Sequence, residues 1–184
     1  MSTAMTIILI VAILAIAAAV WMFFEKRRTQ QLRTKFGPEY DRMLQHTDRR
    51  HAESALEDRS KRVAKFNIRR LTVDERLRFA DAWKREQARF VDDPRLAVGN
   101  ADKLVGEVMR ARGYPMAEFE QRAADISVDH PHVVENYRAA HEIAARESSG
   151  NATTEDLRQA MVYYRALFVE LLEEPVMETQ EVRR

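Results

Sequence analysis

The chain of 184 residues contains no cysteine, and glycine and proline occur only five times each. Without a cysteine to acylate, a lipoprotein anchor is excluded, whereas the compartment is not decided because many exported proteins also lack cysteine. The few glycines and prolines stand almost entirely at the expected ends of elements. No strand-like alternation of apolar and polar residues persists, and β-branched residues are thin after residue 24. These absences predict an all-α protein.

Several chemical motifs are also absent from the sequence. There is no G-x-x-x-x-G-K-[ST] or G-x-G-x-x-G loop, so nucleotide binding has no support. There is no G-x-S-x-G elbow for a serine nucleophile. No H-E-x-x-H motif provides two zinc ligands on one helix face. Internal repeats and low-complexity linkers are lacking as well.

One long uncharged run is present, "AMTIILIVAILAIAAAVWMFF", over residues 4–24. At about 1.5 Å per residue it covers about 30 Å, the thickness of a hydrocarbon core. The sequence therefore predicts a transmembrane helix at 4–24, after a short extracytoplasmic N-terminus at 1–3. Cleavage as a signal peptide remains an alternative, although the run exceeds a usual h-region and no basic n-region precedes it.

The residues that flank this run predict its orientation. Basic residues follow the run and none precedes it, so the positive-inside rule predicts an outward N-terminus and a cytoplasmic C-terminal domain. The predicted localisation is a bacterial inner membrane with a single pass. An inverted or processed anchor with an exported domain stays open as an alternative. The predicted anchor flanks are Trp21, Lys26, Arg27 and Arg28.

The net charge of +1 conceals an asymmetry between two parts of the chain. Residues 25–70 contain 14 Lys and Arg against 7 Asp and Glu, whereas residues 71–184 contain 16 against 22. Anionic headgroups attract basic juxtamembrane segments, so we expect a lipid bilayer as one partner. Nucleic acid is not expected, because acids interrupt the basic residues and no binding motif appears.

Helix signals recur after residue 37. Gly37 and Pro38 separate a short helix from the preceding one, and polar stalk helices are expected up to residue 70. Thr72 and Glu75 form a capping box, and Asp93 is expected to cap the next helix up to Gly113. Further helices are expected over about 115–125, 131–147 and 153–172.

The helices after residue 71 all carry broad apolar stripes, with Leu77 and Trp83 among the stripe residues of the first one. Such stripes must be buried against one another. The sequence therefore predicts a compact four- to five-helix bundle over 71–173, basic stalk helices over 25–70 and a flexible tail over 174–184.

A family resemblance rests on five segments: "KFGPEYDR", "ARFVDDP", "RGYP", "FEQRAADISVDHPHVVENYRAAH" and "ATTEDLRQAMVYYRALFVELLE". They resemble an uncharacterised all-helical bacterial family of the actinobacterial and acidobacterial type, over roughly residues 36–172. The predicted anchor lies outside the resemblance. The resemblance implies no activity, and no catalytic residue can be transferred from it.

One segment, "DHPHVVENYRAAHE", suggests a site, because imidazole and carboxylate side chains are plausible zinc or iron ligands. The candidate ligands are His130, His132 and Glu135, next to Asp129. The competing interpretation is structural: Asp129 caps a helix that Pro131 begins. His141 lies about 13 Å along the helix from His132, too far to share one ion. We predict no catalytic residue, no metal and no cofactor.

The function expected from these patterns is a membrane-tethered, non-catalytic helical interaction or scaffold module. Its partner would be another protein or a second copy of the chain, and no small-molecule substrate is identified. The alternative is a small metal-dependent hydrolase that uses the Asp129, His132 and Glu135 region.

Overall fold

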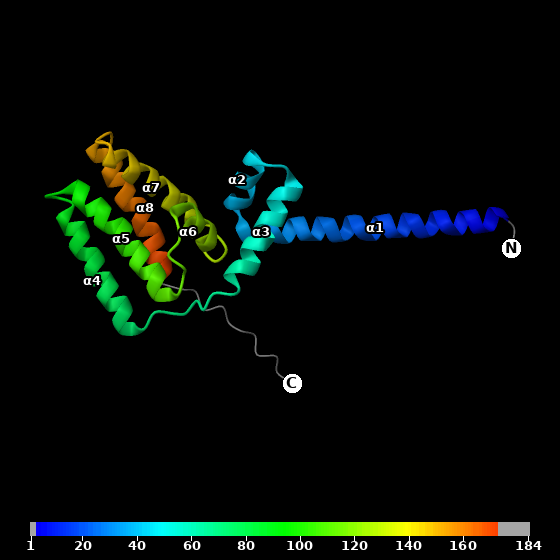
Figure 1. The fold of residues 1–184 in the computed structure, drawn as a ribbon, viewed down its shortest axis with the longest axis horizontal. Helices are drawn as coiled ribbons and strands as arrows, with labels where there is room; N and C mark the ends of the chain where they lie inside the picture. The colour runs from blue at the N-terminus through cyan, green and yellow to red at the C-terminus, as the bar shows by residue number, and fades with distance from the viewer. Residues whose placement is uncertain (1–2, 173–184) are drawn as a thin grey trace. The chain divides into compact units, whose positions relative to one another are not determined.

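The structure is a computed structural model that describes residues 3–172, with side chains from Ala12 onward. All regular elements in this range are helices, so the predicted all-α class is confirmed for the described residues (Figure 1). The predicted tail, 174–184, and the first two residues lie outside that range. The helices are α1 (Thr3–Phe36), α2 (Pro38–His46), α3 (Arg49–Val63), α4 (Val73–Arg89), α5 (Pro94–Arg112), α6 (Phe119–Ile126), α7 (Val134–Ser148) and α8 (Thr154–Leu172).

The predicted membrane span is contradicted by the structure. Within the part of the chain whose side chains are described, no helix combines the length and the apolar character needed to cross a bilayer. The predictions of a single-pass transmembrane protein and of an inner-membrane localisation are therefore wrong.

The chain divides into two compact units, residues 1–58 and 59–184. In the first unit, Gly37 adopts a positive φ of 47° and Pro38 begins α2, as the sequence predicts. The buried carboxylate of Glu53 accepts hydrogen bonds from Tyr40 Oη at 3.0 Å and Thr29 Oγ1 at 2.7 Å. The small apolar core of this unit consists of Leu32, Phe36, Tyr40, Ala52 and Leu56.

The second unit contains the helical bundle that the sequence predicts. The helix α8 packs against both α5 and α7, α4 packs against α5, and α6 packs against α7. One contiguous apolar core joins these helices and includes Trp83, Val105, Tyr137, Leu167 and Phe168. The helix α5 therefore supports two neighbours, α4 and α8, which do not pack closely along each other.

The predicted helix starts and stops at α4 and α5 are confirmed. Thr72 and Glu75 form the complete capping box of α4. Asp93 accepts a hydrogen bond from the Leu96 amide at the start of α5. Gly113 ends α5 with φ 98°, and a side chain there would lie 2.3 Å from the Asn67 carbonyl oxygen. Only glycine permits both this conformation and this close approach.

Two other predicted starts are wrong. The helix α6 begins at Phe119 rather than at Pro115, and α7 begins at Val134 rather than at Pro131. Asp129 does not cap α7, because its Oδ2 accepts a hydrogen bond from Tyr114 Oη at 2.7 Å. The chain from His130 to Val133 instead forms a turn, closed by the Val133 amide on the His130 carbonyl.

Candidate functional site

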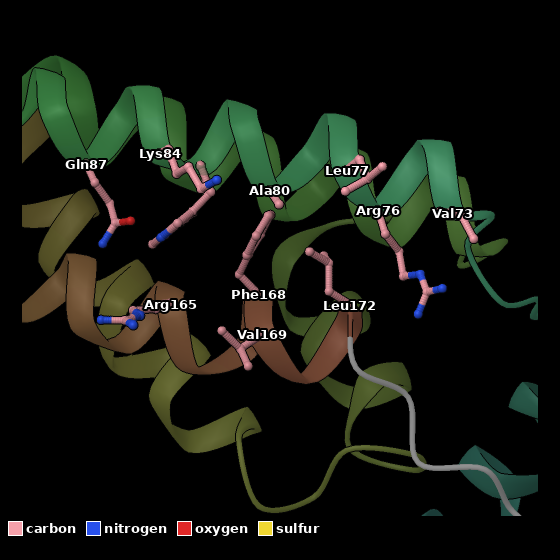
Figure 2. A pocket seen from close by; sticks show the side chains of 11 residues that line it. Val73, Arg76, Leu77, Ala80, Lys84, Gln87, Arg165, Phe168, Val169 and Leu172 are labelled. Carbon is pink, nitrogen blue, oxygen red and sulfur yellow. The ribbon is translucent and has the colours of Figure 1, made fainter.

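An open groove with a volume of about 470 Å³ lies between α4 and α8 in the second unit (Figure 2). We name it the α4/α8 groove. On α4 its residues recur at helical spacing over four turns, and on α8 over two. It is lined by Val73, Arg76, Leu77, Ala80, Trp83, Lys84, Gln87, Arg165, Phe168, Val169 and Leu172.

Two stacked rings close the inner side of the α4/α8 groove. The rings of Trp83 and Phe168 lie 4.8 Å apart with an interplanar angle of 23°. Both side chains are buried, with exposed fractions of 5% and 2%. They fill the space between α4 and α8 where both helices pack against α5. On the outer side of the two rings, the walls of the groove are exposed to solvent.

The walls of the α4/α8 groove are apolar and exposed. Leu77 is 61% exposed and Val73 60% exposed, whereas the sequence predicted that the whole α4 stripe would be buried. That prediction is wrong for Leu77, because α4 packs on α5 rather than on α8. Across the groove, Val169 of α8 is 38% exposed. Leucine and valine side chains left in water forgo most of the free energy that burial would supply.

The rim of the α4/α8 groove carries charge of one sign. Among the described residues, its charged lining residues are Arg76, Lys84 and Arg165, and none of its described lining residues is acidic. Lys84 lies 3.5 Å from Asp81, and both are well exposed, so this pair contributes little. Neither Arg76 nor Arg165 has a carboxylate partner among the described residues. In Figure 2, Arg76 and Arg165 stand on opposite walls.

His130, one of the sequence-predicted metal ligands, is part of a buried structural network. Its Nε2 lies 3.3 Å from Arg112 Nη1, and its Nδ1 lies 3.3 Å from Glu170 Oε1. Arginine can only donate, so Nε2 accepts and the ring proton resides on Nδ1, facing Glu170. Arg112 Nη1 also donates to the Leu171 carbonyl at 3.1 Å. Burial, with a further contribution from the Arg112 charge, lowers the pKa of His130 despite the opposing carboxylate of Glu170.

The other predicted ligands do not converge on His130. Asp129 is held by Tyr114, His132 is exposed, and Glu135 is half-buried on α7. His141 stacks on the Phe119 ring, at a centroid distance of 3.5 Å. Among the described residues, no group of three or more His, Cys, Asp or Glu is arranged to hold a metal ion. The ligand set on which the hydrolase alternative depends is therefore not assembled.

The predicted anchor flanks lie on α1. Trp21 is 59% exposed, and Lys26 is exposed. The guanidinium of Arg27 lies 4.7 Å from the centroid of the Phe23 ring. Arg28 forms an ion pair with Glu57 of α3, within the same unit. Two of the three cations thus contact side chains of the first unit.

A second buried polar contact escaped the sequence analysis. Asp125, only 2% exposed, accepts hydrogen bonds from Arg62 Nε at 2.9 Å and Nη2 at 2.6 Å, and from Gln121 Nε2 at 2.8 Å. Arg59 Nη1 donates to Ser127 Oγ at 2.8 Å. These contacts join the end of α3 to α6, more than 60 residues away in the sequence, and no local pattern indicates them.

The α4/α8 groove also escaped the sequence analysis, although its signal is present. Basic residues interrupt the apolar residues along one face of α4, in the order Val73, Arg76, Leu77, Ala80 and Lys84. A basic residue inside an apolar stripe is a sign that the stripe borders solvent.

No protein-family model matches the chain, and no curated protein or solved structure matches it.

Proposed function

We propose that this chain is a non-catalytic interaction module that binds an acidic amphipathic helix of a protein partner in the α4/α8 groove. The observation that carries the proposal is the exposed apolar wall, with Leu77 at 61% exposure, beside a rim whose charged residues, within the described part of the chain, are all cations. A contiguous exposed apolar surface framed by polar residues is typical of a protein interaction site.

The shape of the groove favours a helical ligand. Its two walls are themselves helices, and Val73 and Gln87 are 14 residues apart, so α4 offers about 21 Å of wall. An amphipathic helix inserts its apolar side chains at i, i+3, i+4 and i+7 into such a groove. The α4 wall presents the complementary spacing with Val73, Leu77, Ala80 and Lys84.

The charge of the rim favours an acidic ligand. Glutamates that flank the apolar face of a bound helix would come close to Arg76, Lys84 and Arg165. Such rim charges mainly select the partner and speed the encounter, while the apolar walls supply most of the affinity. A basic helix would be repelled by the same three cations.

A designed peptide tests the proposal. The probe is an amphipathic helix of about 18 residues with leucines on one face and glutamates beside them, and its partner peptide carries lysines instead. We expect the acidic probe to shift the methyl resonances of Val73, Leu77 and Val169 in NMR spectra of the full chain, and the basic probe to leave them unchanged. Equal binding of both peptides, or shifts elsewhere in the chain, would contradict the proposal.

A matched pair of variants tests the role of the rim. Arg76→Glu should weaken binding of the acidic probe about tenfold, since reversing a rim charge changes the free energy by about 1.4 kcal/mol. Arg78→Glu changes the same charge two residues away on α4, outside the groove, and should have no comparable effect. Isothermal titration calorimetry measures both.

A further inference from the structure

We propose that the first unit binds a small organic phosphate in a recess between α1 and the start of α3. This site is separate from the α4/α8 groove and does not depend on the function proposed for it. We name it the α1/α3 recess. Its volume is about 400 Å³, and small-molecule sites typically have about 300–1,000 Å³. It is lined by Met22, Glu25, Lys26, Thr29, Gln30 and Arg33 of α1 and by Arg49, the first residue of α3.

The α1 wall of the recess follows one face of the helix. Its residues recur every three or four positions from Met22 to Arg33, so the wall is about 16 Å long. A phosphate group at the Arg33 end would leave room for a short organic group along the rest of the wall. Met22, at the other end, offers that group an apolar contact.

The charge of the recess matches a doubly charged anion. Among its described lining residues are three cations, Lys26, Arg33 and Arg49, and one carboxylate, Glu25, which together give a formal charge of +2. A phosphomonoester carries about −1.5 to −2 at pH 7. Glu25 stands eight residues before Arg33, about 12 Å along the helix, so it does not neutralise the arginine end.

The two arginines come together beside one buried residue, Tyr40. Burial and the hydrogen bond to Glu53 raise the pKa of Tyr40, and the charges of Arg49 and Arg33 oppose this rise. Two guanidinium groups that act on the same side chain are placed to hold one anion between them. Guanidinium groups suit phosphate, because their planar donors bind its oxygens in pairs.

Both arginines have donors left for a ligand. Arg33 lies 3.5 Å from Asp41, but both side chains are well exposed, so the pair contributes little. Arg49 has no carboxylate partner among the described residues, and Asp48, which precedes it, forms an ion pair with His51 instead.

The position of Arg49 is unfavourable without an anion nearby. The first turn of α3 contains Arg49 and Arg50 and no acidic residue. The positive end of the helix dipole disfavours cations in a first turn. Proteins break such local rules mainly at functional sites, where another gain compensates. A phosphate bound beside Arg49 would supply that compensation.

Titration of the full chain with glycerol 3-phosphate tests the proposal. We expect the side-chain Nε–H resonances of Arg33 and Arg49 to shift and saturate in NMR spectra, while that of Arg165 in the α4/α8 groove does not move. Glycerate, with a singly charged carboxylate in place of the phosphate, should bind at least tenfold more weakly. Equal binding of the two compounds, or no saturable shift, would overturn the proposal.

A matched pair of variants tests the recess itself. Arg49→Gln should weaken binding of glycerol 3-phosphate at least tenfold, because it removes one of the two guanidinium groups. Arg50→Gln removes the same charge from the same helical turn but outside the recess, and should leave the affinity unchanged. Both side chains are exposed, so both variants should fold, which circular dichroism verifies. Equal effects of the two substitutions would overturn the assignment of the site.

A lipid headgroup could present the same phosphate chemistry as a soluble compound. Vesicles that contain phosphatidic acid distinguish the two sources. Binding of glycerol 3-phosphate in solution, without vesicles, supports the proposal. Binding to the vesicles by a chain that does not bind glycerol 3-phosphate would overturn it.

Discussion

The two sides of α8 differ in how their helix neighbours meet them. Towards α7 the two helices pack directly, and residues such as Tyr137, Tyr164 and Leu167 are fully buried. On the other side, α8 and α4 do not pack directly against each other, because both pack against α5, and Leu77 and Val169 remain exposed. Helices with similar apolar stripes thus yield a sealed core on one side and an open groove on the other. The position of α5, rather than the apolar stripe itself, determines whether a buried core or an open groove forms.

The largest expected contrast between the two sides comes from removing leucine side chains. Leu167→Ala should lower the free energy of unfolding by about 2–5 kcal/mol, because a fully buried leucine leaves a cavity. Leu77→Ala in the groove should cost about 0.5 kcal/mol or less, because that side chain is largely in water. Urea unfolding followed by circular dichroism measures both. Similar losses at the two positions would mean that the groove is filled in solution.

A buried and an exposed arginine give the next contrast. Arg112→Met should cost about 1–3 kcal/mol, because the buried carbonyl of Leu171 loses a charged donor. Arg165→Met on the groove rim should change the stability by no more than about 0.5 kcal/mol. The same urea titration reports both variants. A large loss of unfolding free energy in Arg165→Met would show that this rim cation already stabilises the fold through an acidic partner.

These contrasts mark what the sequence predicts and what it does not. The caps by Thr72, Asp93 and Gly113 were predicted correctly, because capping depends on residues within one turn. The start of α7 was predicted wrongly, because the carboxylate of Asp129 has a distant competitor, Tyr114, 15 residues away. Local chemistry can be read from the sequence, whereas competition between distant partners cannot.

The candidate sites follow the same rule. His130 was singled out as a candidate metal ligand because of its neighbours in the sequence, yet its contacts come from Arg112 on α5 and Glu170 on α8. The exposure of Leu77 depends on where α5 holds α4, which no stripe on α4 alone can reveal. The predicted membrane span is contradicted as well, because no helix in the part of the chain whose side chains are described is long and apolar enough to cross a bilayer.

On the sealed side, the buried imidazole predicts a pH dependence. The folded-state pKa of His130 is lowered by burial, so below its ordinary value of about 6.5 the unfolded chain binds the proton more readily. Stability should therefore fall as the pH decreases from about 7 through the folded-state pKa. His130→Gln should flatten this part of the profile of thermal midpoint against pH. An unchanged slope in the variant would remove His130 as the cause.

On the open side, the smallest effect is expected from the capping box of α4. The pKa of Glu75 is lowered to about 2, first by the hydrogen bonds from Arg69 and then by that from the Thr72 amide. Its contribution is present above about pH 4.5 and is lost as the pH falls towards 2. The thermal midpoints of the wild type and Glu75→Gln should therefore converge between pH 5 and about 2. Parallel curves would contradict this assignment.

The most direct test of the account is the affinity of the acidic amphipathic probe for two aspartate variants, measured by calorimetry. Leu77→Asp places a charge in the exposed apolar wall of the groove, and Val91→Asp places the same charge at a site that is 84% exposed and outside the groove. The account predicts that Leu77→Asp abolishes measurable binding while Val91→Asp binds as the wild type does. Equal affinities for the two variants would contradict the assignment of the groove as the binding site.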